Sequence, residues 1–264
     1  MLRDSVAPGV SCLAKAALTL WHLGFPVQAL QRGEEALALA QTLPHYHSLA
    51  YAQRDVALLH YRCRDAPAVQ AQAEALLALA TAEGLTPFVR YGHLLRGWAL
   101  AVQGHSQVDL PALHQSVAAI VASGQTLVRG RYLLLLAEIL GHVGQTAAGL
   151  DLLTEALAVI EDIGKGNLRA EAYRLQGEFL LRQPHPDVER AEGCLQQALS
   201  IARHQQARSL ELRAALSLSQ LWYQRQQYAA ARQLLAEVHG WFTEGFDMHD
   251  LQAAAALLHR LAAH

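Results

Sequence analysis

The sequence predicts an all-α fold in which helical hairpins stack into a superhelical solenoid. Apolar residues recur at helical spacing along most of the 264 residues, and short turns interrupt this pattern in register about every forty residues. No segment keeps the two-residue alternation of a half-buried strand over a useful length. A single hairpin has more apolar surface than it can bury alone, so stacking against neighbours is expected to complete the core.

The turns define the register of the hairpins. Gly24, Gly104 and Gly144 end helical segments at corresponding places, and Arg64 stands at the remaining one, inside the turn YRCRDAP. After three of these turns the second helix opens with similar text, as in PVQALQRGEEALALA, APAVQAQAEALLALA and TAAGLDLLTEALAVI. The repetition indicates six hairpins of about forty residues each.

The helix ranges follow from this register. The first helices of the hairpins are expected at residues 12–23, 47–62, 87–103, 126–142, 167–183 and 207–225. The second helices are expected at residues 26–42, 66–83, 110–123, 146–163, 188–205 and 228–239. The units are residues 11–43, 47–84, 86–124, 126–164, 167–206 and 207–240, within one domain over residues 1–264. The third unit is the least regular, because GHSQVDLP implies that its second helix starts late, near Asp109.

Small residues recur early in the second helices. Ala29, Gly149, Ala191 and Ala231 occupy corresponding positions there. A small side chain lets two helix backbones approach closely, as tightly stacked hairpins require. The longer turn RQPHPD precedes the fifth of these helices, and Asp187 is predicted to cap its N-terminus.

The stretch GWFTEGFDMHDLQ near the C-terminus is predicted to introduce a terminal capping helix over residues 247–263. Asp247 stands where an N-cap belongs, so its carboxylate is expected to accept a hydrogen bond from a backbone amide of the first turn. Phe246 and Leu251 occupy the positions of a hydrophobic staple around that cap. The stretch resembles an active site in composition, but this interpretation makes it structural.

Two aromatic residues of the same stretch, Trp241 and Phe242, follow the end of the last second helix. They are predicted to pack against the end of the hydrophobic core, where a missing neighbour would otherwise leave apolar surface in water.

Composition and charge exclude several classes of partner. The formal net charge is -2 and the pI is about 6.7, with acids and bases interspersed, so neither a nucleic-acid footprint nor a polybasic membrane patch is expected. The three cysteines are far apart without a CxxC pair, which favours a reducing compartment. The N-terminal residues MLRDSVAPGV show no signal-peptide pattern, so the chain is expected to be cytoplasmic, with no membrane-spanning segment.

The segments LRGWALA and GWFTEGFD carry a resemblance that extends over nearly the whole chain. The sequence resembles the C-terminal tetratricopeptide-like (TPR) helical repeat region of bacterial signalling proteins that contain an adenylate/guanylate cyclase domain and an AAA-type or STAND-type ATPase domain. The resemblance implies a sensor or interaction arm, with the cyclase and ATPase domains upstream. Catalysis is not expected here, because the nearest text to a phosphate-binding loop, GKGN, lacks the required spacing and hydroxyl.

The binding hypothesis rests on the first helices, which line the concave face of such a stack. Arg and Tyr are enriched where protein surfaces make contacts, so these helices are expected to bind an acidic or C-terminal-carboxylate peptide. The candidate partner-binding residues are Arg54, Arg90, Arg96, Arg129, Arg131, Tyr132, Arg169, Arg174 and Arg213. The alternative is structural: the arginines pair with acids such as Glu138, Glu171, Glu178 and Glu211, and the rings belong to the core.

The sequence therefore predicts a non-catalytic interaction or regulatory module that binds a protein or peptide partner in bacterial signal transduction and needs no cofactor. One alternative is the small-molecule sensor arm of a STAND-type regulator. A second alternative is a metal-dependent hydrolase at the loop LPHYHSL, with His45, His47 and, brought near by the fold, Cys63 as candidate ligands. Structural zinc usually needs four ligands, and the sequence shows no complete set at compatible spacing.

Overall fold

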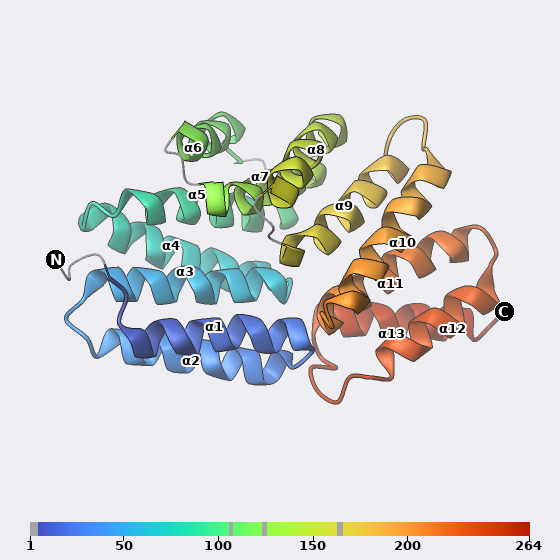
Figure 1. Ribbon diagram of the computed structural model, residues 1–264, viewed down its shortest axis with the longest axis horizontal. Coiled ribbons are helices and arrows are strands. Elements are labelled where there is room, and N and C mark those ends of the chain that lie inside the picture. The colour runs from blue at the N-terminus through green and yellow to red at the C-terminus, as the bar shows by residue number, and fades with distance from the viewer. Residues whose placement is uncertain (1–4, 106–107, 123–125, 163–165) are drawn as a thin grey trace. The chain divides into compact units, whose positions relative to one another are not determined.

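The computed structural model describes residues 5–105, 108–122, 126–162 and 166–264, and within these ranges it is all-helical, with no strand (Figure 1). The helices in chain order are α1 (Pro8–Leu23), α2 (Pro26–Gln41), α3 (Tyr46–Arg62), α4 (Ala66–Ala82), α5 (Thr86–Val102), α6 (Leu110–Ala122), α7 (Thr126–His142), α8 (Thr146–Asp162), the 3₁₀ turn η1 (Gly166–Leu168), α9 (Arg169–Leu181), α10 (Val188–His204), α11 (Arg208–Gln224), α12 (Tyr228–His239) and α13 (His249–Leu261). The predicted all-α class is confirmed. None of the described helices has the length and apolar character needed to cross a lipid bilayer.

The helix boundaries follow the predicted ranges closely, with informative exceptions. Helix α1 begins at Pro8, four residues before the predicted start, because proline suits the first turn of a helix. Helix α9 begins at Arg169 after the short 3₁₀ turn η1, where the sequence predicted one continuous helix. The division into six units stays a prediction.

The packing divides the chain into two compact units. The first unit comprises Met1–Trp21 and Phe25–Ala119, and the second comprises His22–Gly24 and Ile120–His264. In the first unit α3 packs against α2, α4 and α5; in the second, α9 packs against α7, α8, α10 and α11, and α13 packs against α11 and α12. Successive helices therefore form packed pairs within each unit, and each unit has its own core.

The turn at Arg64 has the backbone conformation that the register predicted. Its φ is 61°, close to the positive φ of Gly104 (73°) and Gly144 (83°). The amide of Asp65 donates to the carbonyl of His60 at 3.0 Å, which closes the helix end in a left-handed cap. The equivalence of Arg64 with the turn glycines is confirmed, although a side chain makes this conformation less favourable than it is for glycine.

Aspartate side chains cap several helices as their sequence positions suggested. Asp187 Oδ1 accepts a hydrogen bond from the amide of Arg190 at 3.1 Å, which confirms the predicted cap of α10. Asp109 Oδ1 accepts from the amide of Ala112 at 3.1 Å, so α6 starts as late as GHSQVDLP implied. These bonds satisfy amides that have no partner inside the helix.

The small residues of the second helices are buried at helix contacts. Ala29, Ala191 and Ala231 have no exposed surface, and Gly149 is buried too. A Cβ added to Gly149 would lie 2.5 Å from a ring carbon of Phe179 on α9. The predicted close approach of helices is confirmed at this position.

The predicted start of the terminal helix is wrong. Helix α13 begins at His249, and Met248 precedes it in an extended conformation, with no side-chain cap. Asp247 is exposed and Phe246 is 52% exposed, so neither the N-cap nor the staple forms. The reason is tertiary: Asp250, in the first turn, pairs with Arg213 at 2.7 Å and so places a carboxylate near the positive end of the helix.

The two aromatic residues of the same stretch pack against a hydrophobic core as predicted, but not at an end that lacks a neighbour, because a Cβ added to Gly24 would lie 2.4 Å from a ring carbon of Trp241. Phe242 is buried in the core formed by α10, α11, α12 and α13. Trp241 packs against the same core, with its ring perpendicular to that of Phe242 and 5.1 Å from the guanidinium of Arg208. These residues stabilise the C-terminal part of the second unit.

The two aspartates give a direct test of the corrected capping scheme. We expect Asp187→Ala to lower the free energy of unfolding by about 1 kcal/mol, because the amide of Arg190 loses its acceptor. Asp247→Ala should change it by less than about 0.5 kcal/mol, since an exposed side chain away from such features contributes little. Urea denaturation of both variants measures the difference, and a larger loss in Asp247→Ala would restore the original cap.

Candidate functional site

The structure separates the nine predicted partner-binding residues by exposure. Tyr132, Arg174 and Arg213 are buried, and each is covered by the chain's own residues. The other six are half-buried: Arg54, Arg90, Arg96, Arg129, Arg131 and Arg169. These six arginines can therefore reach a partner without a change in the fold. Their role in binding stays a prediction.

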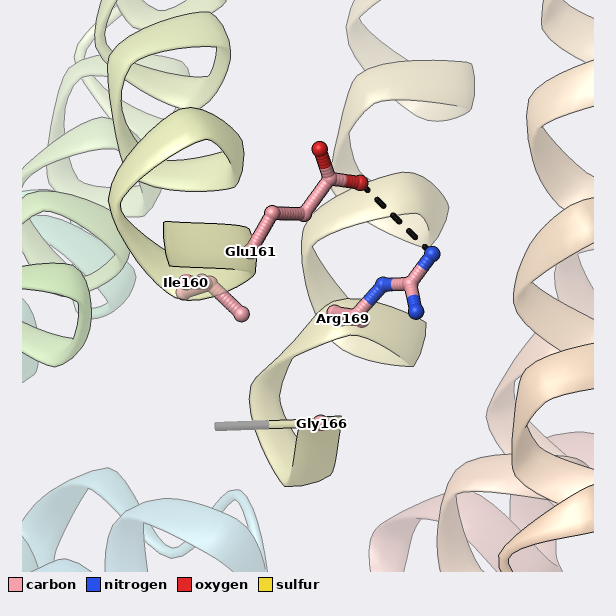
Figure 2. A pocket seen from close by; sticks show the side chains of 4 residues that line it. All are labelled: Ile160, Glu161, Gly166 and Arg169. Carbon is pink, nitrogen blue, oxygen red and sulfur yellow. Dashed lines mark ion pairs between the residues drawn. The ribbon is translucent and has the colours of Figure 1, made fainter. Parts of the chain in front are cut away.

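Arg169 lines a small pocket at the end of α8 (Figure 2), together with Ile160, Glu161 and Gly166. The pocket holds about 190 Å³. Arg169 Nη2 lies 3.5 Å from Glu161 Oε1, and both side chains reach solvent, so this ion pair contributes little stability. Gln205 Nε2 donates a hydrogen bond to the carbonyl of Gly166 at 2.6 Å.

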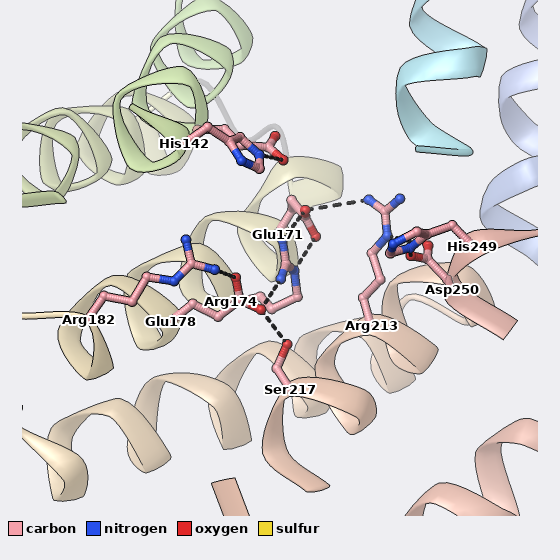
Figure 3. Close-up of polar contacts among 10 residues, drawn as sticks. His142, Glu171, Arg174, Glu178, Arg182, Arg213, Ser217, His249 and Asp250 are labelled. Carbon is pink, nitrogen blue, oxygen red and sulfur yellow. Dashed lines mark hydrogen bonds and ion pairs between the residues drawn. The ribbon is translucent and has the colours of Figure 1, made fainter. Parts of the chain in front are cut away.

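Arg174 is the centre of a buried ion network on α9 (Figure 3). Its Nε and Nη2 donate to the two carboxylate oxygens of Glu171 at 2.9 and 2.7 Å, and its Nη1 donates to Glu178 Oε1 at 2.6 Å. Burial disfavours the charged guanidinium, but the charges of Glu171 and Glu178 outweigh it and raise the pKa of Arg174 well above its ordinary value. The side chain therefore stays charged and is fully engaged inside the unit.

Arg213 extends this network to the terminal helix. Its Nε donates to Asp250 Oδ2 at 2.7 Å, and its Nη1 lies 3.5 Å from Glu171 Oε1 (Figure 3). Ser217, also on α11, donates its hydroxyl to Glu178 Oε1 at 2.8 Å. For Arg174 and Arg213 the structural alternative, pairing with acids, therefore describes the observed contacts. Sequence reasoning missed Asp250 as a partner, although its place in a first helical turn was a signal.

Two further predicted residues make exposed ion pairs with second helices. Arg96 Nε lies 3.5 Å from Glu74 Oε1 on α4, and Arg129 pairs with Glu155 on α8. Ion pairs between partly exposed side chains contribute little stability, so either arginine can exchange its partner at small cost.

Arg54 lies among three aromatic rings in the first unit. Its guanidinium carbon is 4.3 Å from the ring centre of Tyr51, 5.3 Å from that of Tyr91 and 5.6 Å from that of Phe88. Such cation–π contacts hold the guanidinium in place. Tyr51 comes from α3 and the other two rings come from α5, so the packing of these two helices brings the three rings around Arg54.

Asp55 binds two cations at once. Arg54 Nε donates to Asp55 Oδ1 at 2.8 Å, Arg54 Nη2 lies 2.6 Å from the same oxygen, and Lys15 Nζ donates to Asp55 Oδ2 at 3.1 Å. Burial lowers the pKa of Arg54, but Asp55 and then Tyr91 raise it above its ordinary value overall. Lys15 was not predicted for this site, because nothing local in the sequence indicates that α1 and α3 place it beside Asp55.

The histidine-rich loop is used for structure. His45 Nδ1 accepts a hydrogen bond from the amide of Ser48 at 3.3 Å and so caps α3, and His47 packs edge-on against Phe88 at 5.1 Å. Across residues 5–105, 108–122, 126–162 and 166–264, no three His, Cys, Asp or Glu side chains come together as metal ligands.

The described residues thus define an all-α protein of packed helix pairs, with a cation–aromatic cluster in one unit and a buried ion network in the other. Comparison with models of known protein families gives no match, and comparison with curated protein sequences gives none either.

Proposed function

We propose that this chain is a non-catalytic interaction module that binds a protein or peptide partner through the first helices of its hairpins. The observation that carries the proposal is that first helices contact each other within each unit: α3 packs on α5, α7 on α9, and α9 on α11. In helical repeat proteins such a row of neighbouring helices forms an extended binding surface. The proposal includes the tetratricopeptide-like superhelical stack expected from the sequence.

The side chains on these helices support a partner with acidic or polar groups. In the first unit Arg54 and Lys15 are held beside aromatic rings, and Arg90 and Arg96 on α5 are half-buried. Arginine and tyrosine combine contact area with directed hydrogen bonds, and for this reason they dominate binding surfaces. The resemblance to repeat regions of bacterial signalling proteins supports a regulatory role, with cyclase and ATPase domains supplied upstream.

A small-molecule sensor has weaker support. The pocket beside Arg169 holds about 190 Å³, below the roughly 300 Å³ at which ligand sites for drug-sized molecules usually begin. An extended surface formed by several helices suits a peptide better than a compact ligand.

A peptide array tests the proposal. Immobilised peptides of varied charge and aromatic content are probed with the labelled chain, and we expect saturable binding to a subset of them. Arg96→Glu and Arg131→Glu, each on a first helix, should reduce this binding by about tenfold or more, since each reverses a charge at the contact surface.

The matched control is Arg232→Glu, an exposed residue on the second helix α12. It makes the same charge change and should leave binding and melting temperature unaltered. If all three variants bind alike, the first helices do not form the contact surface; if the chain binds no peptide, the proposed function is wrong.

A further inference from the structure

We infer that Lys15 and Arg54 form a binding site for a peptide carboxylate on the first unit. This carboxylate site rests on the proposed function, because it assigns the chemistry of one position on the proposed contact surface. Four observations carry it: the local charge balance, the free edge of the guanidinium, the aromatic surroundings and the exposure of the two cations.

The local charge balance leaves one positive charge at this place. Asp55 is a single carboxylate and is shared by two cations, Arg54 on its Oδ1 and Lys15 on its Oδ2. The whole chain carries a formal net charge of -2, so this excess is a local property and not part of a basic surface. A singly charged anion would complete the balance.

The guanidinium of Arg54 has donors that remain unused. Nε and Nη2 face Asp55 Oδ1, and the described residues supply no acceptor to Nη1. Arginine presents five N–H donors in a planar fork that matches the two oxygens of a carboxylate. The edge that carries Nη1 is therefore the part of the side chain that can bind an incoming oxyanion.

The residues around the Arg54 guanidinium hold it in a fixed orientation before a ligand binds. Tyr51, Tyr91 and Phe88 enclose the guanidinium, and Asp55 fixes its rotation, so little side-chain entropy remains to be lost when a ligand binds. The rings also displace water from one side, which strengthens the attraction between opposite charges. Tyr51 serves both cations, because the Lys15 ammonium lies 5.2 Å from its ring centre.

Exposure gives the direction of approach. Asp55 is only 2% exposed, whereas the side chain of Arg54 is 18% exposed and that of Lys15 is 58% exposed. The acid lies on the inside and the cations lie toward solvent, so a ligand meets the positive groups first. The flexible side chain of Lys15 can turn its ammonium from Asp55 to an oxygen of a bound carboxylate, since ammonium donors rotate freely.

The same balance favours a carboxylate over a phosphate group. A carboxylate brings one negative charge, which equals the local excess. A phosphate monoester carries about 1.5 to 2 negative charges at neutral pH and would leave excess negative charge next to the buried Asp55. The carboxylate can belong to an acidic side chain or to a peptide C-terminus.

Fluorescence anisotropy with three labelled decapeptides tests the site and separates these two sources. The probes are oligoglutamate with an amidated C-terminus, oligoglutamine with a free C-terminus, and oligoglutamine with an amidated C-terminus, which has no carboxylate. We expect the chain to bind at least one of the first two about tenfold more tightly than the third, the factor that one charge-assisted hydrogen bond produces. Inorganic phosphate at equal concentration should compete less well than acetate.

Lys15→Gln is the decisive variant, because it leaves the contact between Arg54 and Asp55 in place. Lys15→Gln should lower the affinity for the preferred probe by about threefold to tenfold, and Arg54→Gln should lower it by about tenfold or more. Arg32→Gln is the matched control: Arg32 lies in the same unit on α2, is exposed, and pairs with Glu35. This control should bind as the unaltered chain does.

Equal binding of the preferred probe by the unaltered chain and by Lys15→Gln would overturn the carboxylate site, and so would equal binding of all three probes. These outcomes differ from failure of the proposed function. If array peptides still bind and lose affinity in Arg96→Glu, the contact surface stands and only the assignment of this site is wrong.

Discussion

Replacing Arg174 by methionine should lower the free energy of unfolding by about 3–5 kcal/mol, because it breaks a buried ion network. The guanidinium makes three hydrogen bonds to Glu171 and Glu178 inside the second unit. Without it, Glu171 keeps only the ion pair with Arg213 at 3.5 Å and Glu178 only that with Arg182 at 3.7 Å, so both carboxylates lose their closest cation. Urea denaturation followed by circular dichroism measures the loss.

Arg182→Met is the matched control for Arg174→Met. Arg182 also contacts Glu178, at 3.7 Å, but its side chain is 51% exposed, so its removal should cost less than about 0.5 kcal/mol. Adding Glu171→Gln to Arg174→Met should recover part of the stability, because it removes a buried carboxylate charge that has lost its closest cation. Equal losses for Arg174→Met and Arg182→Met would mean that the buried network contributes nothing in solution.

Gly141→Ala should destabilise the second unit by about 1–3 kcal/mol through overpacking. A Cβ at Gly141 on α7 would lie 2.3 Å from the terminal ring carbon of Phe179, which is buried and cannot move away. Gly149→Ala on α8 should behave in the same way, because its Cβ would lie 2.5 Å from the same ring. Thermal and urea denaturation check both variants.

Gly193→Ala is expected to have the opposite effect on stability in the same denaturation experiments. Gly193 lies inside α10, and a Cβ there would meet no atom within 4 Å. The substitution should stabilise the protein by up to about 1 kcal/mol, since alanine has the higher helix propensity. Combining Gly141→Ala with Phe179→Leu should reduce the loss relative to the sum of the two single variants. Purely additive losses would show that the ring is not the obstacle.

The helices and turns could be predicted because they depend on neighbours in the sequence. Apolar spacing, turn glycines and capping aspartates act within a few residues, and Arg64 was recognised as a turn position from the register together with Asp65 and Pro67 beside it. The start of α13 could not be predicted in this way. Two acids, Asp247 and Asp250, are both placed where a carboxylate favours a helix start, and a contact with Arg213 on another helix decides between them.

The candidate site shows the same limit more strongly. Arg169 and Arg174 lie on one helix, five residues apart, yet one lines an open pocket and the other is buried between two glutamates. Arg169 is the first residue of α9, whereas Arg174 has Glu171 and Glu178 one helical turn away on either side. The local pattern therefore offered this pairing, but not the burial of Arg174. The carboxylate site depends on Lys15 and Asp55, which lie on different helices and meet only when α1 and α3 pack.

Phe179 has a mechanical consequence for the second unit. Its ring occupies the space left by Gly141 on α7 and Gly149 on α8, so one side chain of α9 is wedged against both helices of the preceding pair. A change in the crossing angle of α7 and α8 would press one of the two backbones into the ring. When the second unit is bent, the contact between Phe179 and the two glycines should therefore resist the change and keep α7, α8 and α9 stiff relative to one another.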